Sequence, residues 1–155
     1  MNIDVMYSRK TDDWKTPREL YNVFINNGCI DPCPFKSNVN GLLYNFKNTK
    51  LFVNPPFSKM QIWVDWCITQ FKNNCTVYLL IPNRSDTKYY HEILKYNPLI
   101  IFIKGRLKYN DCGNSAPFPT VLMVLSPNKQ TNKQTNAYMS CTYETLINII
   151  RGKQI

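Results

Sequence analysis

The sequence has 155 residues, which is enough for one domain with one hydrophobic core. Hydrophobic residues make up 44% and aromatic residues 14%, and this composition excludes an intrinsically disordered chain. The net charge of +9, from 19 Lys and Arg against 10 Asp and Glu, favours a polyanionic partner such as nucleic acid. The longest apolar runs, residues 99–103 and 121–125, are far shorter than the roughly 20 residues that span a bilayer, so we expect no membrane partner.

Cysteine and histidine are arranged in a way that argues against a metal site. None of the six cysteines forms a CxxC pair, only Cys29 and Cys33 lie close together, and His91 is the only histidine. Zinc sites usually need two closely spaced pairs of ligands, so we expect reduced thiols and no metal. The first residues carry charge without an apolar run behind it, so we expect no signal peptide and an intracellular protein.

The first predicted elements are a helix and two short strands. Thr16 can act as the N-cap of a helix that has Pro17 in its first turn and ends near residue 27. Strands are predicted at residues 29–31 and 51–53, and the polar, turn-rich stretch between them is expected to be a loop.

The middle of the chain is predicted to alternate between helix and strand. A capping box at Ser58 begins a helix that runs to about residue 73. The unbroken apolar run at residues 76–81 is typical of a strand buried on both faces of a parallel sheet. Ser85 or Asp86 can then cap a third helix.

The last part of the chain is predicted to close the sheet. Residues 99–103 and 120–125 read as an antiparallel hairpin joined by the loop 104–119, and the alternation of strands and helices predicts an α/β fold. Residues 128–136, NKQTNKQTN, are expected to be a flexible linker, followed by a C-terminal helix in residues 137–155. The sequence leaves open whether that helix folds back or meets a partner, and whether the chain is a monomer or a homodimer.

The most specific motif is Asn54-Pro55-Pro56-Phe57, which lies between a predicted strand and a predicted helix. A conjugated amino group is a poor nucleophile, because its lone pair is delocalised into the ring. The Asn54 side-chain oxygen and the Pro55 carbonyl could accept its two N–H bonds, and the prolines hold these acceptors in advance. Phe57 offers a ring face for an extruded base. The alternative is an ordinary strand-ending turn, since Asn-Pro and Pro-Pro are common breakers.

Five motifs occur in one order between about residue 11 and residue 125. They are DWKTP (13–17), IDPC (30–33), FVNPPF (52–57), IPNRSDT (81–87) with His91, and GRLK (105–108) with SAPFPT (115–120). In these motifs the sequence resembles the small phage-type DNA adenine methyltransferases of the Dam family. The resemblance implies an α/β fold in residues 1–127, a reduced Rossmann-like class I methyltransferase sheet with a closing antiparallel hairpin.

The same resemblance implies an activity. It implies S-adenosylmethionine as cofactor, double-stranded DNA as substrate and the exocyclic N6 amino group of adenine as methyl acceptor. It also implies an intracellular enzyme encoded by a phage or another mobile element. Alternatives left open are methylation of an RNA base, cytosine N4 or a protein glutamine, and a catalytically silent nucleic-acid-binding relative.

The resemblance also implies roles for individual residues. Trp14, Thr16 and Pro17 match the segment that lies against the methionine part of the cofactor, although an indole such as Trp14 commonly packs on a neighbouring helix. Asp31, with the adjoining Pro32, matches the acidic position near the cofactor's ammonium or ribose. The catalytic motif is matched by Asn54, Pro55, Pro56 and Phe57. Where relatives often carry Asp before an aromatic residue, this chain has Asn45, which could accept a hydrogen bond from the cofactor adenine.

Basic residues near the predicted site are candidates for contact with nucleic acid. They are Lys59, Arg84, Arg106 and Lys108. Arg84 can reach a phosphate from the end of a strand, or it pairs with Asp86. Arg106 and Lys108 lie in a basic, aromatic loop suited to nucleic acid, or in an ordinary solvated loop. Because no segment is left for a recognition domain, we expect a short or degenerate recognition site.

Overall fold

The computed structural model describes residues 12–111, 113–127 and 137–152. Its centre is a mixed sheet with the strand order β1-β2-β4-β3-β5. The strands are β1 (Lys50–Val53), β2 (Thr76–Pro82), β3 (Leu99–Lys104), β4 (Thr120–Leu125) and β5 (Tyr138–Thr142). β4 runs antiparallel to both of its neighbours, whereas β1 and β2, and β3 and β5, pair in parallel. The predicted α/β class and the β3–β4 hairpin are confirmed, and the sheet is compatible with a Rossmann-like fold.

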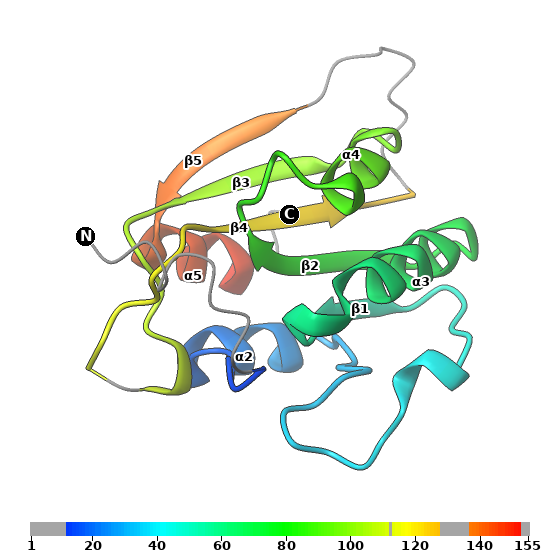
Figure 1. Ribbon diagram of the computed structural model, residues 1–155, viewed down its shortest axis with the longest axis horizontal. Helices are drawn as coiled ribbons and strands as arrows, with labels where there is room; N and C mark the ends of the chain where they lie inside the picture. The colour runs from blue at the N-terminus through cyan, green and yellow to red at the C-terminus, as the bar shows by residue number, and fades with distance from the viewer. Residues whose placement is uncertain (1–11, 112, 128–136, 153–155) are drawn as a thin grey trace.

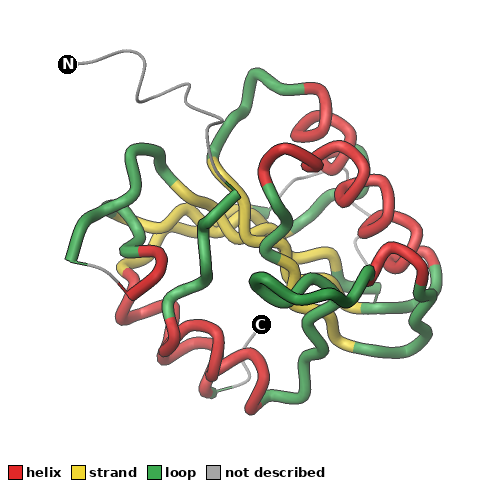
Figure 2. The backbone as a smooth tube through the Cα atoms, turned by 60° about the horizontal axis from the view of Figure 1, so that its bottom comes forward, coloured by secondary structure: helices red, strands yellow, loops and turns green. Residues whose placement is uncertain are grey.

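Helices cover both faces of this sheet (Figures 1 and 2). They are α2 (Arg18–Asn26), α3 (Met60–Lys72), α4 (Lys88–Leu94) and α5 (Tyr143–Arg151), with short 3-10 turns η1 (Gly41–Leu43), η2 (Phe57–Lys59) and η3 (Tyr109–Asp111). Residues of α2 and α5 share one hydrophobic cluster with one face of the sheet, and residues of α3 and α4 share a second cluster with the other face. The sheet therefore lies in the middle of three layers, and every residue of β2 after the first is buried.

The helix starts differ from the predicted ones. The predicted N-caps Thr16 and Ser58 are wrong, because α2 begins after Pro17 and α3 begins at Met60, without a side-chain cap. The Thr16 hydroxyl instead accepts a hydrogen bond from the Asn54 side chain at 3.0 Å. The Ser58 hydroxyl donates to Asp12 at 2.5 Å. Both side chains are therefore used by distant partners rather than by their own helices.

The third helix also begins later than predicted. Neither Ser85 nor Asp86 is its cap, because α4 starts at Lys88 with Thr87 in the N-cap position. The Thr87 hydroxyl donates to the Arg84 carbonyl at 2.7 Å, so it closes a turn that precedes the helix.

The ends of the sheet were the hardest parts to predict. The strand predicted at residues 29–31 is reduced to one parallel bridge between Ile30 and Leu51. Residues 138–142 form β5, where the sequence predicted a helix throughout residues 137–155. Cys141 is the buried residue of β5. The sequence of this strand therefore shows neither a run nor an alternation of apolar residues. The predicted linker 128–136 lies outside the described residues.

The C-terminal helix folds back onto the body of the protein. Its buried residues Leu146, Ile147 and Ile150 join the cluster that contains α2. The Asn27 side chain, at the end of α2, also donates to the Ile150 carbonyl at 2.8 Å. Within the described residues, no helix is long and apolar enough to cross a membrane.

Candidate functional site

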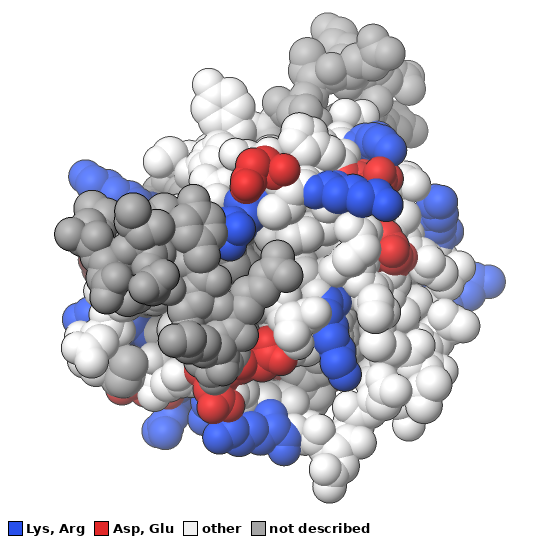
Figure 3. Space-filling view, viewed as in Figure 1, with Lys and Arg blue, Asp and Glu red and all other residues white. Residues whose placement is uncertain are grey.

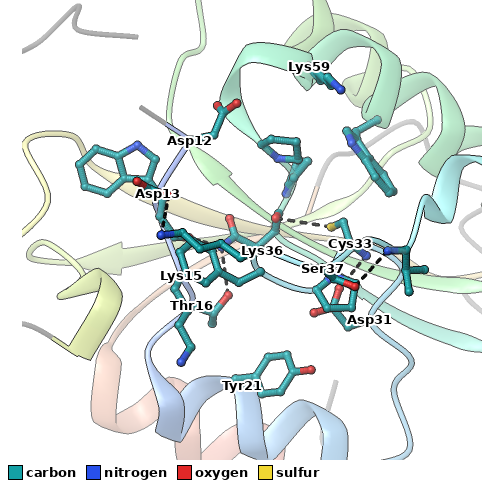
Figure 4. Close-up of a pocket in the computed structure, with 18 of the residues that line it drawn as sticks. Asp12, Asp13, Lys15, Thr16, Tyr21, Asp31, Cys33, Lys36, Ser37 and Lys59 are labelled. Atoms are coloured by element: carbon teal, nitrogen blue, oxygen red, sulfur yellow. Dashed lines mark hydrogen bonds and ion pairs between the residues drawn. The ribbon is translucent and has the colours of Figure 1, made fainter. Parts of the chain in front are cut away.

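A cavity of about 940 Å³ lies where β1 ends, between the segment before α2 and the loop that follows Ile30 (Figure 4). Its lining comes from four parts of the chain: the segment 12–22, which includes the first turns of α2, residues 31–42, the turn 54–56, and Lys59 with Trp63 at the beginning of α3. The carboxyl end of a strand in an α/β sheet is the usual place for a ligand. The structure brings Trp14, Thr16, Asp31 and residues 54–56 together at this cavity.

Asn54 is held in one orientation by the segment that precedes α2. Its Nδ2 donates to the Trp14 carbonyl at 2.7 Å and to the Thr16 hydroxyl at 3.0 Å. A carbonyl can only accept, so the amide nitrogen must face Trp14 and the oxygen must face away from it. That oxygen, Oδ1, is buried and has no hydrogen-bond partner in the described structure. A buried unpaired acceptor costs about 1–3 kcal/mol and is typical of a group whose partner arrives with a ligand.

The backbone of the motif supplies a second acceptor beside Asn54. The Asn54 carbonyl accepts a hydrogen bond from the Cys33 thiol at 3.5 Å, and the Pro56 carbonyl accepts from the Lys59 N–H at 3.0 Å. Pro55 lines the cavity together with Asn54 and Pro56, and its carbonyl is the remaining backbone acceptor of this turn. The proline rings fix the φ angles on either side of it, so its direction is set before any ligand binds.

Trp14 and Phe57 belong to an aromatic cluster beside the cavity. Their rings are nearly parallel, at 15°, with centroids 6.1 Å apart. Phe118 meets both rings edge-on, at 5.0 Å from Trp14 and 5.2 Å from Phe57, and Tyr109 lies 5.8 Å from Trp14. Trp14 also lines the cavity, whereas Phe57 does not. The indole thus packs on aromatic rings, and it also lies against the hydrophobic cluster that contains the buried residues of α2.

Asp31 is a half-buried carboxylate that faces the cavity across from Tyr21 (Figure 4). Burial raises the pKa of Asp31 to about 6, although hydrogen bonds from the Cys33 N–H, at 2.9 Å, and from the Tyr21 hydroxyl act in the opposite direction. No cationic side chain of the described residues forms an ion pair with Asp31. The carboxylate is therefore available to a cationic ligand.

Two residues assigned to the cofactor are buried next to the cavity without lining it. Pro17 precedes the first turn of α2. Pro32 packs against Gly41 so closely that a Cβ at Gly41 would lie 1.9 Å from the Pro32 carbonyl oxygen. Both prolines therefore support the residues that line the cavity and do not line it themselves.

Asn45 does not reach the cavity. Its Oδ1 accepts a hydrogen bond from the fully buried Gln70 side chain at 3.2 Å, and Gln70 in turn accepts from the Phe46 N–H at 2.7 Å. The expectation that Asn45 meets the cofactor is therefore not supported, because this side chain anchors its loop to α3.

The predicted nucleic-acid contacts lie in different places. Lys59 lines the cavity on the side opposite Tyr21 (Figure 4). Arg84 lies 3.9 Å from Asp86, so the predicted alternative of an ion pair is present. Arg106 and Lys108 are exposed and do not line the cavity. Figure 3 shows basic side chains spread around the face of the molecule, with acidic ones between them.

Asp12 is a site residue that sequence reasoning missed. Its carboxylate accepts from both the N–H and the hydroxyl of Ser58, at 2.9 and 2.5 Å. This contact fixes the residue that directly follows the Asn54–Phe57 motif. The signal in the sequence was weak, because an Asp next to Asp13 and a Ser after Phe57 show no sign of being partners.

The fold and the site together define an α/β domain with a cavity at the carboxyl end of a strand and an unpaired amide oxygen beside it. The sequence matches the family described as DNA N-6-adenine-methyltransferase (Dam) over residues 5–151, and the chain belongs to this family. Membership implies a methyltransferase, a transferase that acts on adenine in DNA, and it confirms the resemblance seen in the motifs. No curated protein and no solved structure matches the chain.

Proposed function

We propose that the chain transfers a methyl group from S-adenosylmethionine to the exocyclic N6 amino group of adenine in double-stranded DNA. The observation that carries this proposal is the buried, unpaired Oδ1 of Asn54, in a chain of the Dam family. We further propose that the sheet is a reduced class I methyltransferase sheet, in which β5 and α5 complete the core of the catalytic domain.

The chemistry follows from how acceptors change the amino group of adenine. Its lone pair is delocalised into the ring, so the nitrogen must become more tetrahedral before it can attack. Asn54 Oδ1 accepts one N–H and the Pro55 carbonyl accepts the other, which exposes the lone pair. Because Trp14 and Thr16 already hold the Asn54 amide, the acceptor needs no reorganisation when the charge develops. The extra proton leaves after the nitrogen has become cationic, so no general base is required.

The cavity residues fit a cofactor that carries positive charge. Asp31 offers a half-buried carboxylate without a cationic partner in the described structure, which suits an ammonium group. Trp14 and Thr16 lie on the opposite wall, and Pro17 and Pro32 hold the two walls from behind. S-adenosylmethionine, when bound, would supply the methyl group from its sulfonium centre.

The target base must leave the duplex to reach Asn54. Extrusion costs a few kcal/mol, and stacking on an aromatic ring returns roughly 1–3 kcal/mol. Phe57, two residues after Pro55, supplies such a ring. Lys59 lies beside it at the cavity, and Arg84, Arg106 and Lys108 are candidates for the DNA backbone and base edges. Double-stranded DNA as substrate would place the enzyme inside the cell.

The decisive experiment measures transfer from labelled S-adenosylmethionine to duplex DNA, RNA and protein, with mass spectrometry of the modified product. We expect N6-methyladenine in DNA. Asn54→Ala should lower the rate by about 100- to 1000-fold while cofactor affinity stays near wild type, because Asn54 serves the acceptor amine. Asn97→Ala, a change in an exposed turn, is the matched control.

Other outcomes point elsewhere. Product on RNA, on cytosine N4 or on a glutamine side chain would replace the proposed substrate. Cofactor binding without any transfer would indicate a catalytically silent relative. Near-normal turnover by Asn54→Ala would remove the proposed mechanism.

A further inference from the structure

Asn110, in the 3-10 turn η3 that follows β3, is joined to a distant part of the chain by three hydrogen bonds. Its Oδ1 accepts from the Lys15 N–H at 2.9 Å, and its Nδ2 donates to the Asp13 carbonyl at 2.6 Å. Its own N–H donates to the Lys15 carbonyl at 2.9 Å. Asn110 has a φ of 63° and a ψ of 14°, a left-handed conformation that Asn tolerates better than most residues. Both the side chain and the backbone of Asn110 thus face residues 13–15.

The next residue extends this contact to the start of α2. Asp111 also has a positive φ, 52°, and its Oδ1 accepts from the Arg18 N–H at 2.8 Å. Residues 13–18 are therefore held at both ends by two consecutive residues of the β3–β4 connection. Between these ends lie the Trp14 carbonyl and the Thr16 hydroxyl, which fix the Asn54 amide.

The other half of the same connection carries the exposed cations assigned to DNA. Arg106 and Lys108 alternate with Leu107 and Tyr109, which are buried. The Leu107 carbonyl accepts from the Ala116 N–H at 2.8 Å, and the Tyr109 hydroxyl lies 3.2 Å from the Thr120 hydroxyl. Leu107 and Tyr109 are thus anchored in the domain, and the chain runs from Lys108 through Tyr109 directly to Asn110. This is the route by which a displacement of Arg106 and Lys108 would reach Asn110.

We propose that Asn110 is a positioning residue that couples contact between DNA and residues 104–111 to the orientation of Asn54. This inference rests on the proposed function. The path runs from Arg106 and Lys108 through Asn110 to residues 13–16, and from their Trp14 carbonyl and Thr16 hydroxyl to Asn54. Since coupling between two binding events is reciprocal, DNA should raise the affinity for a cofactor-site ligand, and that ligand should raise the affinity for DNA by the same factor.

The test uses Asn110→Gly, which keeps the left-handed backbone accessible and removes the two side-chain hydrogen bonds. The matched control is Asn97→Gly, because Asn97 is also exposed with a φ of 49° and lies in the turn after α4, away from the cavity lining. Three quantities are measured for each full-length variant: the single-turnover methylation rate at saturating DNA and cofactor, the melting temperature, and the affinity for S-adenosylhomocysteine with and without DNA.

We expect Asn110→Gly to lower the single-turnover rate by about tenfold to a hundredfold, because a small misplacement of an acceptor costs that much. Its melting temperature should stay close to that of Asn97→Gly, and the gain in S-adenosylhomocysteine affinity caused by DNA should disappear. If Asn110→Gly does not fold, Asn110→Asp keeps the acceptor for the Lys15 N–H, loses the donor to Asp13, and should give an intermediate loss.

A double variant separates positioning from a general structural role. Thr16→Val removes one acceptor that holds Asn54, so it acts further along the same path. If Asn110 acts through that path, the double variant should lose little more rate than the worse single variant. Multiplied losses would overturn the proposal, and so would a wild-type rate in Asn110→Gly. A wild-type protein that transfers nothing to DNA would refute the proposed function itself, whereas an active wild type with an unchanged Asn110→Gly refutes only the coupling.

Discussion

Lowering the pH from 8 to 5 should weaken cofactor binding through Asp31. Burial raises the pKa of this carboxyl from 3.8 to about 6, and only its charged form attracts a cationic ligand. At pH 5, about one unit below that pKa, roughly one protein molecule in ten carries the charge, so the dissociation constant should rise about tenfold. An aspartate that titrated at 3.8 would change the affinity by only about 10% over the same range.

The assay is calorimetric titration of the protein with S-adenosylmethionine at pH 5, 6, 7 and 8, with Asp31→Asn as the control. The wild-type affinity should be constant from pH 7 to 8 and fall by about tenfold per unit below pH 6. The affinity of Asp31→Asn should be weak and show no step near pH 6. A flat wild-type profile, or the same step in Asp31→Asn, would refute the reasoning.

Acid unfolding through Asp31 cannot mimic this effect, because its sign is opposite. A pKa raised in the folded state means that the folded protein binds more protons than the unfolded chain between pH 3.8 and about 6. As the pH falls through 6, this group therefore raises the free energy of unfolding. Above pH 6 the burial of its charged form lowers the free energy of unfolding. Asp31→Asn should accordingly raise the free energy of unfolding at pH 8, by up to about 3 kcal/mol in urea denaturation, less the hydrogen bonds that it loses.

Three further substitutions test other parts of the site and the fold. Phe57→Ala should slow methylation of paired adenine more than of unpaired or mismatched adenine, because a base already outside the stack needs less help from the ring; equal losses on the two substrates would show that Phe57 does not hold the base. Arg106→Ala should relax the sequence context seen in genome-wide mapping of methyladenine, whereas Lys72→Ala at the end of α3 should leave it unchanged. Leu146→Ala should lower the free energy of unfolding by about 2–5 kcal/mol in urea denaturation, because this side chain is fully buried between α5 and α2; a smaller loss would mean that α5 is only loosely attached.

Much of the sheet and the centre of the site could be predicted, because both depend on local patterns. The run at residues 76–81 and the hairpin of residues 99–125 are apolar enough to indicate buried strands without any knowledge of their neighbours. Asp31 and Asn54 were placed at strand ends by the breaks that follow them, and in an α/β sheet strand ends converge.

The parts that could not be predicted depend on contacts between distant residues. Thr16 and Ser58 have the right side chains for N-caps, but Asn54 and Asp12 recruit them. The contact between Asn110 and Lys15 spans 95 positions of the sequence, and no repeating pattern of residues indicates it. β5 was missed for a related reason. An edge strand needs few apolar residues, and β5 is held in place by its pairing with β3.

The attachment of residues 13–18 to Asn110 and Asp111 has a consequence for the order in which the protein assembles. This segment is made roughly a hundred residues before its docking partners, and the helix that covers α2 comes later still. Contacts that close such long loops form slowly, because the entropy of closure is lost before the contacts form. The wall that holds Asn54 is therefore expected to be among the last parts of the nascent chain to settle, and a cofactor that binds the finished cavity would draw the final step of folding to completion.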